Sequence, residues 1–118
     1  MLSHSGSRGL GAAIAKYYSL LAREVCRLPR EAQHFAWLDL NTEAGQEYWM
    51  SMNLAGDYAR ACHERIHLNL AKALGLKPLA NVNNHHNFAW REEIVPGRMA
   101  IVHRKGATPA QKGQAGLI

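Results

Sequence analysis

The chain has 118 residues, 47% of them apolar and 19% charged, a composition that excludes an intrinsically disordered protein and allows one small domain. The formal net charge is +5, and Glu93 is the last acidic residue, whereas Arg98, Arg104, Lys105 and Lys112 follow it. Such a basic surface attracts polyanions such as RNA. No apolar run is long enough to cross a bilayer and no signal peptide is evident, so we expect a cytoplasmic protein without a membrane partner.

The first third of the chain predicts a loop followed by a helix. Residues 3–11 are polar and rich in glycine. Apolar residues then recur at intervals of three and four from Leu10 to Val25, which is the pattern of one helical face, and Pro29 closes the element.

A second, longer helix is predicted after an irregular connector over residues 30–42. Thr42 can cap its start, and an apolar stripe continues to about Leu74. Gly75 is a suitable C-terminal stop, with Pro78 just beyond it.

The segment after the second helix predicts strands at residues 82–95 and 99–104, joined by a turn at residues 95–97. The final residues predict a loop. The expected fold class is therefore α+β: a glycine-rich loop, two helices of which the second is long, and a β-hairpin, all within one partial domain over residues 1–118.

Three polar segments contain residues suited to metal or phosphate chemistry. The loop at residues 4–9 reads His-Ser-Gly-Ser-Arg-Gly and precedes a helix, where unpaired N–H groups attract anions. Its guanidinium, Arg8, can bind two phosphate oxygens at once. The other two segments are Asn83–Asn87 and the cationic run around Arg104 and Lys105. Each has a structural alternative: a capped turn, a polar edge strand and a solvated charge pair.

The two adjacent histidines of the second segment are not equivalent. In a strand, neighbouring side chains point to opposite faces, so His85 and His86 cannot both face one metal ion. One histidine would bind and the other would pack or hydrogen-bond.

A fourth pattern, His63-Glu64-x-x-His67, fits the zinc-binding motif of metalloproteases. On a helix both histidines would share one face. The continuation that one large protease class requires, with a glycine and a third histidine, is absent. A chance match on an amphipathic helix is the better interpretation, and a zinc hydrolase remains an alternative hypothesis.

Taken together, the motifs resemble those of the RtcB family of RNA ligases. The matching sequences are His-Ser-Gly-Ser-Arg-Gly-Leu-Gly at residues 4–11, Asn-His-His-Asn at 84–87 and Val-His-Arg-Lys-Gly-Ala-Thr at 102–108. The helical stretch also matches, with Gly-Gln-Glu-Tyr at 45–48 and Met-Asn-x-Ala-x-x-Tyr-Ala at 52–59. The resemblance covers nearly the whole chain and implies a central part of an RtcB-like catalytic domain.

The resemblance implies an enzyme that uses two Mn²⁺ ions and GTP to join RNA ends. A 2′,3′-cyclic phosphate or 3′-phosphate end would be joined to a 5′-hydroxyl end, in tRNA splicing or RNA repair. His4 and His86 would bind metal, and His86-Asn87 would bind the guanine nucleotide. The phosphates of RNA or nucleotide would contact Arg8, Arg104 and Lys105.

Several family motifs do not occur in the chain, including the Asp-x-x-Cys-Gly-x-Gly metal motif and the segment with the guanylylated histidine. No catalytic nucleophile is therefore assigned, and the remainder of an RtcB chain would be needed to complete the site. We expect an internal fragment that neither joins RNA nor binds Mn²⁺ tightly by itself. The alternative is a non-catalytic piece that binds RNA through its basic end.

Overall fold

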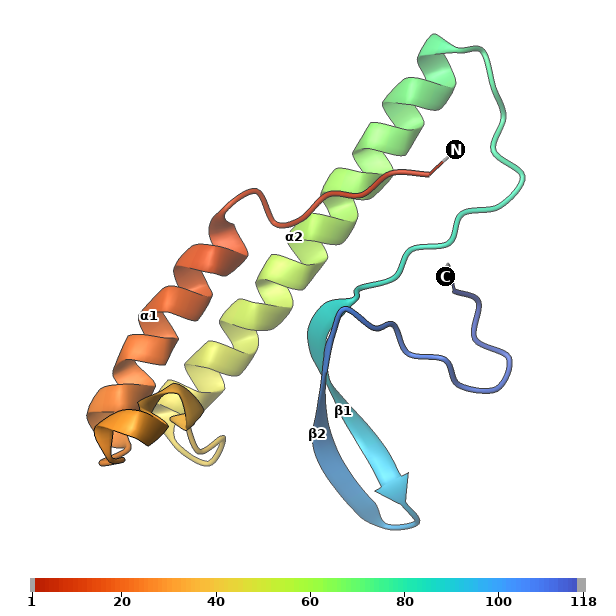
Figure 1. The fold of residues 1–118 in the computed structure, drawn as a ribbon. Helices are drawn as coiled ribbons and strands as arrows, with labels where there is room; N and C mark the ends of the chain where they lie inside the picture. Colours follow the sequence, from red (N-terminus) through yellow and green to blue (C-terminus); the bar gives the residue numbers. More distant parts are fainter. Residues whose placement is uncertain (1, 117–118) are drawn as a thin grey trace. The chain divides into compact units, whose positions relative to one another are not determined.

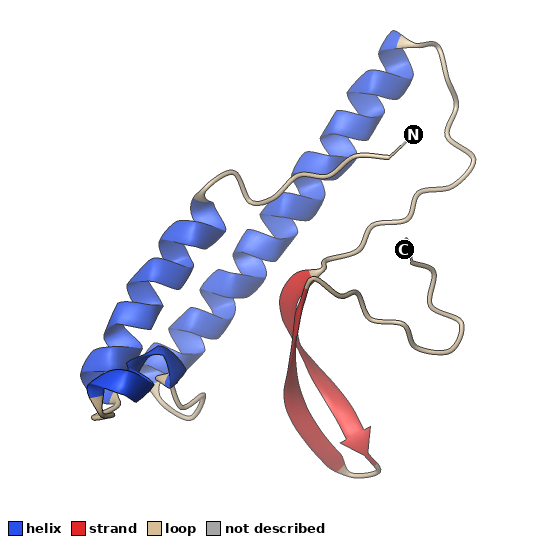
Figure 2. Ribbon diagram, viewed as in Figure 1, coloured by secondary structure: helices blue, strands red, loops and turns tan. Residues whose placement is uncertain are grey.

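The computed structural model describes residues 2–116 and has the predicted α+β composition (Figures 1 and 2). Its elements are α1 (Leu10–Val25), the 3-10 helix η1 (Arg30–Phe35), α2 (Glu43–Ala73), β1 (Asn87–Val95) and β2 (Arg98–Lys105). The described residues form two compact units that divide after Leu70. The assignment of residues 1–118 to a single partial domain stays a prediction.

Helix α1 begins where the sequence pattern predicts, after a turn that needs a left-handed backbone. Gly9 has φ 95°, a conformation that glycine adopts without steric cost. The Ser7 hydroxyl accepts a hydrogen bond from the backbone N–H of Gly11 at 2.7 Å. This bond satisfies one of the N–H groups that a helix start leaves unpaired. The start of α1 is therefore specified locally.

The prediction of an irregular connector over residues 30–42 is wrong at residues 30–35, which form η1. Pro29 precedes this helix with φ −53°, near the value that its ring fixes. Its carbonyl accepts the N–H of Ala32 at 2.9 Å, and Glu31 lies in the first turn. The proline that closes α1 thus also starts a short helical turn.

Helix α2 has the predicted ends. The Thr42 hydroxyl accepts the N–H of Gly45 at 3.2 Å, which confirms the capping role of Thr42. At the other end Gly75 has φ 65°, and the N–H groups of Gly75 and Leu76 donate to the carbonyls of Lys72 and Ala71. This pair of bonds is the Schellman motif, which glycine permits.

The strands form one antiparallel hairpin around the predicted turn, in which Gly97 has φ 78°. The predicted first strand over residues 82–95 is wrong at its start, since β1 begins at Asn87. Asn87 pairs with Lys105, the last residue of β2, so residues 82–86 have no strand opposite them. Asn84 instead donates from its side chain to the carbonyl of Ala115 at 3.3 Å, a bond that does not belong to the strand pairing.

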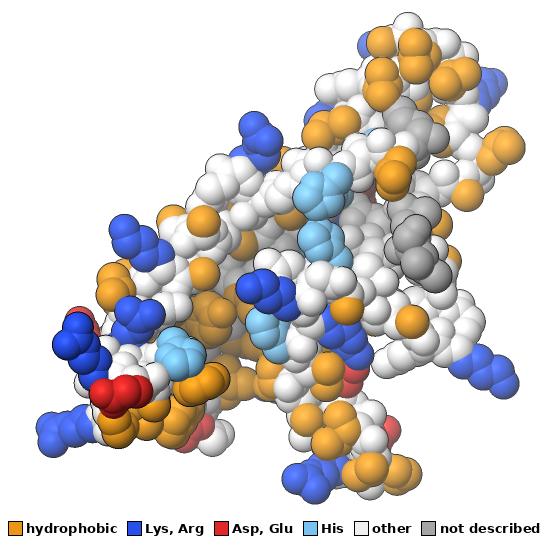
Figure 3. Space-filling view, in the orientation of Figure 1, with side chains coloured by type: hydrophobic (Ala, Val, Ile, Leu, Met, Phe, Trp, Pro, Cys, Tyr) orange, Lys and Arg blue, Asp and Glu red, His pale blue; other side chains and the backbone are white. Residues whose placement is uncertain are grey.

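The interior of the described structure is small. Its buried apolar side chains are small, five alanines and one proline: Ala22, Ala55, Ala59, Ala71, Ala89 and Pro109. Larger apolar side chains are exposed on both units, and Figure 3 shows many of them in orange on the surface. Exposed apolar surface of this extent is typical of a binding interface. No helix within residues 2–116 combines the length and apolar character needed to cross a membrane.

In the first unit, α1 lies beside the N-terminal half of α2 (Figure 1). The rings of Tyr18 and Tyr48 connect the two helices, with centroids 5.1 Å apart. A Cβ placed on Gly11 would lie 3.9 Å from the Cβ of Ala55. Small residues therefore face each other near the start of α1, where the loop of residues 3–9 enters.

Candidate functional site

The loop that contains His4 and Arg8 is attached to helix α2 by two histidine hydrogen bonds. The His67 Nε2 atom lies 2.7 Å from the Ser3 hydroxyl. The His63 Nε2 atom lies 2.8 Å from the backbone carbonyl of Ser5, and it must carry the hydrogen because a carbonyl only accepts. Figure 1 shows the loop crossing α2. The attachment fixes the loop on both sides of His4.

The exposure of the loop residues alternates along the chain. Ser3, Ser5 and Ser7 are half-buried, whereas His4 and Arg8 are exposed. In an extended segment, alternate residues face the same side. Ser3 and Ser5 contact α2 and Ser7 bonds to Gly11 of α1, whereas the predicted metal ligand and the predicted phosphate ligand are both exposed.

Arg8 has an unusual backbone and lies near the middle of α2. Its φ is 53°, in the left-handed region that side chains other than glycine rarely adopt. A hydrogen bond with Cys62 raises the pKa of the Tyr58 hydroxyl, and the positive charge of Arg8 partly opposes this shift. Arg8 thus places a cation beside Tyr58 at the surface of the first unit.

In the second unit, His86 and Asn87 lie at the point where β1 begins. Residues 85 and 86 precede the strand, so the prediction that strand alternation directs His85 and His86 to opposite faces is wrong. The ring of His85 instead stacks on Phe88, with centroids 5.0 Å apart. His86 is exposed, and its carbonyl accepts the N–H of Ala107 at 3.1 Å. The metal and nucleotide roles of His86 and Asn87 stay predictions.

Arg104, a predicted phosphate ligand, makes an ion pair within the hairpin. Both terminal nitrogens of its guanidinium donate to Glu92, each at 2.7 Å. The guanidinium carbon lies 5.1 Å from the ring centre of Trp90, so the side chain passes over the indole to reach the carboxylate. Two donors of Arg104 are therefore already used, whereas Lys105 at the end of β2 is exposed.

The ion pair predicts an acid-sensitive hairpin. The hydrogen bond from Arg104 lowers the pKa of the Glu92 carboxyl below its ordinary value of 4.5. A lowered carboxyl pKa means that the pair stabilises the hairpin above pH 4.5 and that this contribution is lost as pH falls through the lowered value. An NMR titration of the Glu92 carboxyl checks this, with cross-strand contacts followed in parallel. A Glu92→Gln variant should lose this acid transition, and titration at the ordinary pKa would contradict the prediction.

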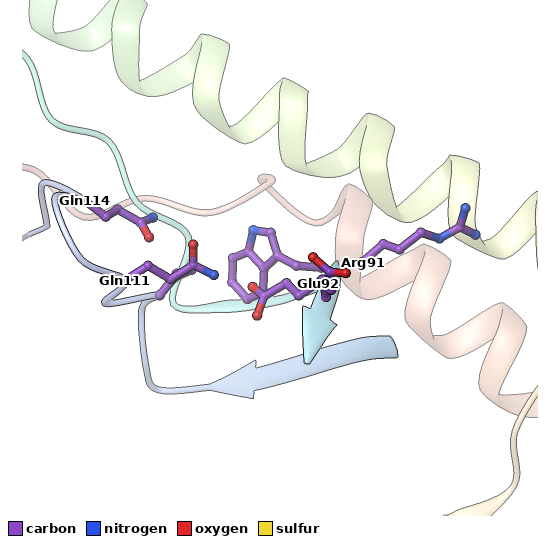
Figure 4. A pocket seen from close by; sticks show the side chains of 7 residues that line it. Arg91, Glu92, Gln111 and Gln114 are labelled. Carbon is purple, nitrogen blue, oxygen red and sulfur yellow. The ribbon is translucent and has the colours of Figure 1, made fainter. Parts of the chain in front are cut away.

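A pocket of about 520 Å³ lies beside the hairpin. Figure 4 shows Gln111 and Gln114 extending from the C-terminal loop toward it, with Glu92 nearby and Arg91 pointing away. Trp90 also lines the pocket. Indole rings stack on nucleobases and glutamine amides hydrogen-bond to base edges, so these groups are suited to a base of single-stranded RNA.

The protease-like pattern has a different structural role from zinc binding. The Nε2 atoms of both histidines contact the loop, so a zinc ion bound through them would have to displace Ser3 and Ser5. Among the side chains of residues 2–116, no group of three or more His, Cys, Asp or Glu is arranged to hold a metal ion. Glu64, between the two histidines, is exposed on α2.

The proteins that this chain resembles are named as RNA ligases. A family model described as tRNA-splicing ligase RtcB matches residues 1–118, and the chain therefore belongs to the RtcB family. It is 29% identical over 132 residues to the RNA-splicing ligase RtcB of Escherichia coli K12, an alignment covering 100% of this chain and 32% of that protein. It is 32% identical over 127 residues to the tRNA-splicing ligase RtcB of Methanocaldococcus jannaschii, covering 93% of this chain and 13% of that protein.

A eukaryotic relative is similar to the same extent. The RNA-splicing ligase RtcB homolog 1 of Entamoeba dispar is 32% identical over 125 residues, which cover 93% of this chain and 23% of that protein. The chain thus spans about a third or less of the length of these relatives. No solved structure matches it.

The sequence did not predict the partners of His63 and His67. The spacing of four residues placed both histidines on one helical face, but the serines they contact lie about sixty residues earlier. The pair of Glu92 and Arg104 was also missed. The strand register places Ala100 opposite Glu92 and Phe88 opposite Arg104, so no directly facing pair of charges signalled this contact.

Proposed function

We propose that this chain is the central part of the catalytic domain of a GTP- and Mn²⁺-dependent RNA ligase. The enzyme would join RNA 2′,3′-cyclic-phosphate or 3′-phosphate ends to 5′-hydroxyl ends, in tRNA splicing or RNA repair. The observation that carries this proposal is the match of the RtcB family model to all 118 residues. The exposure of both the His4 imidazole and the Arg8 guanidinium on the loop supports it.

In this proposal His4 and His86 are ligands of Mn²⁺. Neutral imidazoles suit this metal in combination with harder oxygen ligands, so the two side chains fit the expected donor set. The metal would supply charge compensation at a reacting phosphate. Asn87 would hydrogen-bond to the guanine nucleotide, and the guanidinium of Arg8 would hold a phosphate through two N–H groups.

Arg104 and Lys105 would contact further phosphates of RNA or nucleotide. A guanidinium has five N–H donors, and Glu92 accepts two of these hydrogens. The remaining N–H groups can bind a phosphate without breaking the ion pair. In this arrangement Glu92 would orient Arg104, and the exposed ammonium of Lys105 would add a second positive charge at the end of β2.

The rest of a longer RtcB polypeptide would complete the site in this proposal. Two histidines do not fill the coordination of a metal ion. The exposed apolar side chains of both units, such as Phe35 and Leu79, would pack against the additional polypeptide. We therefore expect the 118-residue chain to be inactive alone.

The test is an end-joining assay with the ligase polypeptide that contains this chain. One RNA has a 3′-phosphate, the other has a labelled 5′-hydroxyl end, and GTP and MnCl₂ are supplied together or singly. We expect joined product only when both are present, and no product from the 118-residue chain above a His4→Ala control. Joining without GTP, or joining by the 118-residue chain, would contradict the proposal.

A second candidate function is RNA binding without catalysis. The pocket beside Trp90 and the cations of the C-terminal region favour it. It predicts that the chain binds single-stranded RNA in EDTA, with affinity reduced by a Trp90→Ala substitution. Fluorescence anisotropy with a labelled oligonucleotide would measure this, and binding that requires Mn²⁺ and GTP would instead favour the ligase.

A further inference from the structure

His63 and His67 lie one helical turn apart on α2, and neither has a role in the family motifs quoted above. Both are half-buried, and both direct Nε2 at the N-terminal loop, at 2.8 Å from the Ser5 carbonyl and 2.7 Å from the Ser3 hydroxyl. The two contacts lie immediately before and immediately after His4 in the sequence. This is the arrangement expected of groups that hold a residue between two fixed points.

We propose that His63 and His67 are positioning residues, which hold residues 3–5 against α2 and thereby aim the His4 imidazole outward. The proposal rests on the proposed function in so far as His4 is a metal ligand. The attachment itself is independent of that role.

The attachment to α2 determines which loop side chains are exposed to solvent. Ser3 and Ser5 contact the helix and are half-buried, whereas His4 between them is exposed, which is the alternation of an extended segment. Arg8 is also exposed, and Ser7, which precedes it, is half-buried. Loss of the histidine contacts would remove two attachments of the loop to α2, whereas the bond between Ser7 and Gly11 at the start of α1 would remain.

The two histidines hold different kinds of group. His63 contacts the main chain, so it fixes the path of the backbone and is insensitive to the side chain at position 5. His67 contacts a serine side chain, so the same attachment can be removed from either partner. A Ser3→Ala variant should therefore reproduce the effect of His67→Ala, and Ser5→Ala should not reproduce that of His63→Ala.

The first measurement is amide hydrogen exchange of residues 3–7 in the intact chain. We expect His63→Ala to accelerate exchange there by about tenfold, the effect of losing one hydrogen bond. His63→Gln should restore most of the protection, because its amide can donate to the Ser5 carbonyl. Glu64→Gln is the matched control, since Glu64 is exposed on the same helix between the two histidines. Thermal unfolding identifies any variant that has lost its fold.

The second measurement separates this proposal from the proposed function. Mn²⁺ is titrated into the ligase polypeptide that contains this chain, and paramagnetic broadening of the His4 ring signals is followed by NMR. We expect broadening in the wild type, and a several-fold higher Mn²⁺ concentration for the same effect in His63→Ala. Changed exchange without any His4 broadening would support the attachment and overturn the metal role. Unchanged exchange in His63→Ala, or equal changes in Glu64→Gln, would overturn the positioning role.

Discussion

A Gly45→Ala substitution is expected to destabilise the first unit by at least about 2 kcal/mol, although alanine is the better helix former. Gly45 is buried in the first turn of α2. A Cβ there would lie 2.6 Å from the carbonyl carbon of Asp39 and 2.9 Å from the Cα of Leu40. Both are backbone atoms, which cannot rotate away as the end of a side chain can.

Gly45→Ala is destabilising because the steric cost of the added Cβ exceeds the gain in helix propensity. In an open helix position, replacing glycine by alanine gains about 1 kcal/mol. Forcing extra atoms into a packed position costs about 1–3 kcal/mol, and more where the backbone must move. The turn before α2 is also held by hydrogen bonds, from Gly45 to Thr42 and from the Gln46 side chain to the Leu40 carbonyl. Moving residues 39 and 40 would disturb these bonds, so the clash outweighs the gain.

Denaturant unfolding followed by circular dichroism measures the change. Gly6→Ala is the matched control, because a Cβ at Gly6 meets no atom within 4 Å and Gly6 has no positive φ. It should change the free energy of unfolding by less than about 0.5 kcal/mol. A Gly45→Ala variant as stable as the wild type would show that the loop before α2 adjusts freely.

A His4→Ala substitution is expected to reduce RNA joining by at least about a hundredfold in the ligase polypeptide that contains this chain. In the proposed function His4 binds Mn²⁺ directly. Mutation of a residue that only supports a metal ligand typically lowers metal affinity or activity by about 10–100-fold. Removal of the ligand itself should lower them by at least as much. Single-turnover joining at saturating GTP measures the effect, and a Mn²⁺ titration shows whether the lost activity follows weaker metal binding.

His34→Ala is the matched control for this experiment. His34 is also an exposed histidine of the first unit, and its ring packs on Phe35 with centroids 3.9 Å apart. Its removal should change joining by less than about twofold, since it belongs to none of the predicted binding residues. Equal activity of His4→Ala and the wild type would exclude His4 as a required ligand.

Local sequence signals predicted most of the secondary structure. The apolar periodicity of α1, the cap at Thr42 and the glycine after α2 each act within a few residues, and all three are confirmed. The turn near Gly97 is confirmed for the same reason. The two errors lie where local preference is weak. Pro29 could end a helix without starting η1, and the start of β1 depends on where β2 ends.

The candidate site also has a part that the sequence predicted and a part that it did not predict. The sequence by itself determined the family and the residues expected to bind metal, nucleotide and phosphate, because these are encoded in short motifs that can be recognised without a fold. The tertiary structure alone decided what His63, His67 and Arg104 contact. Those contacts join residues far apart in the chain or across the hairpin, and their geometry depends on how helix, loop and strands pack. Hydrogen bonds require partners within about 3 Å, and only the folded chain brings them there.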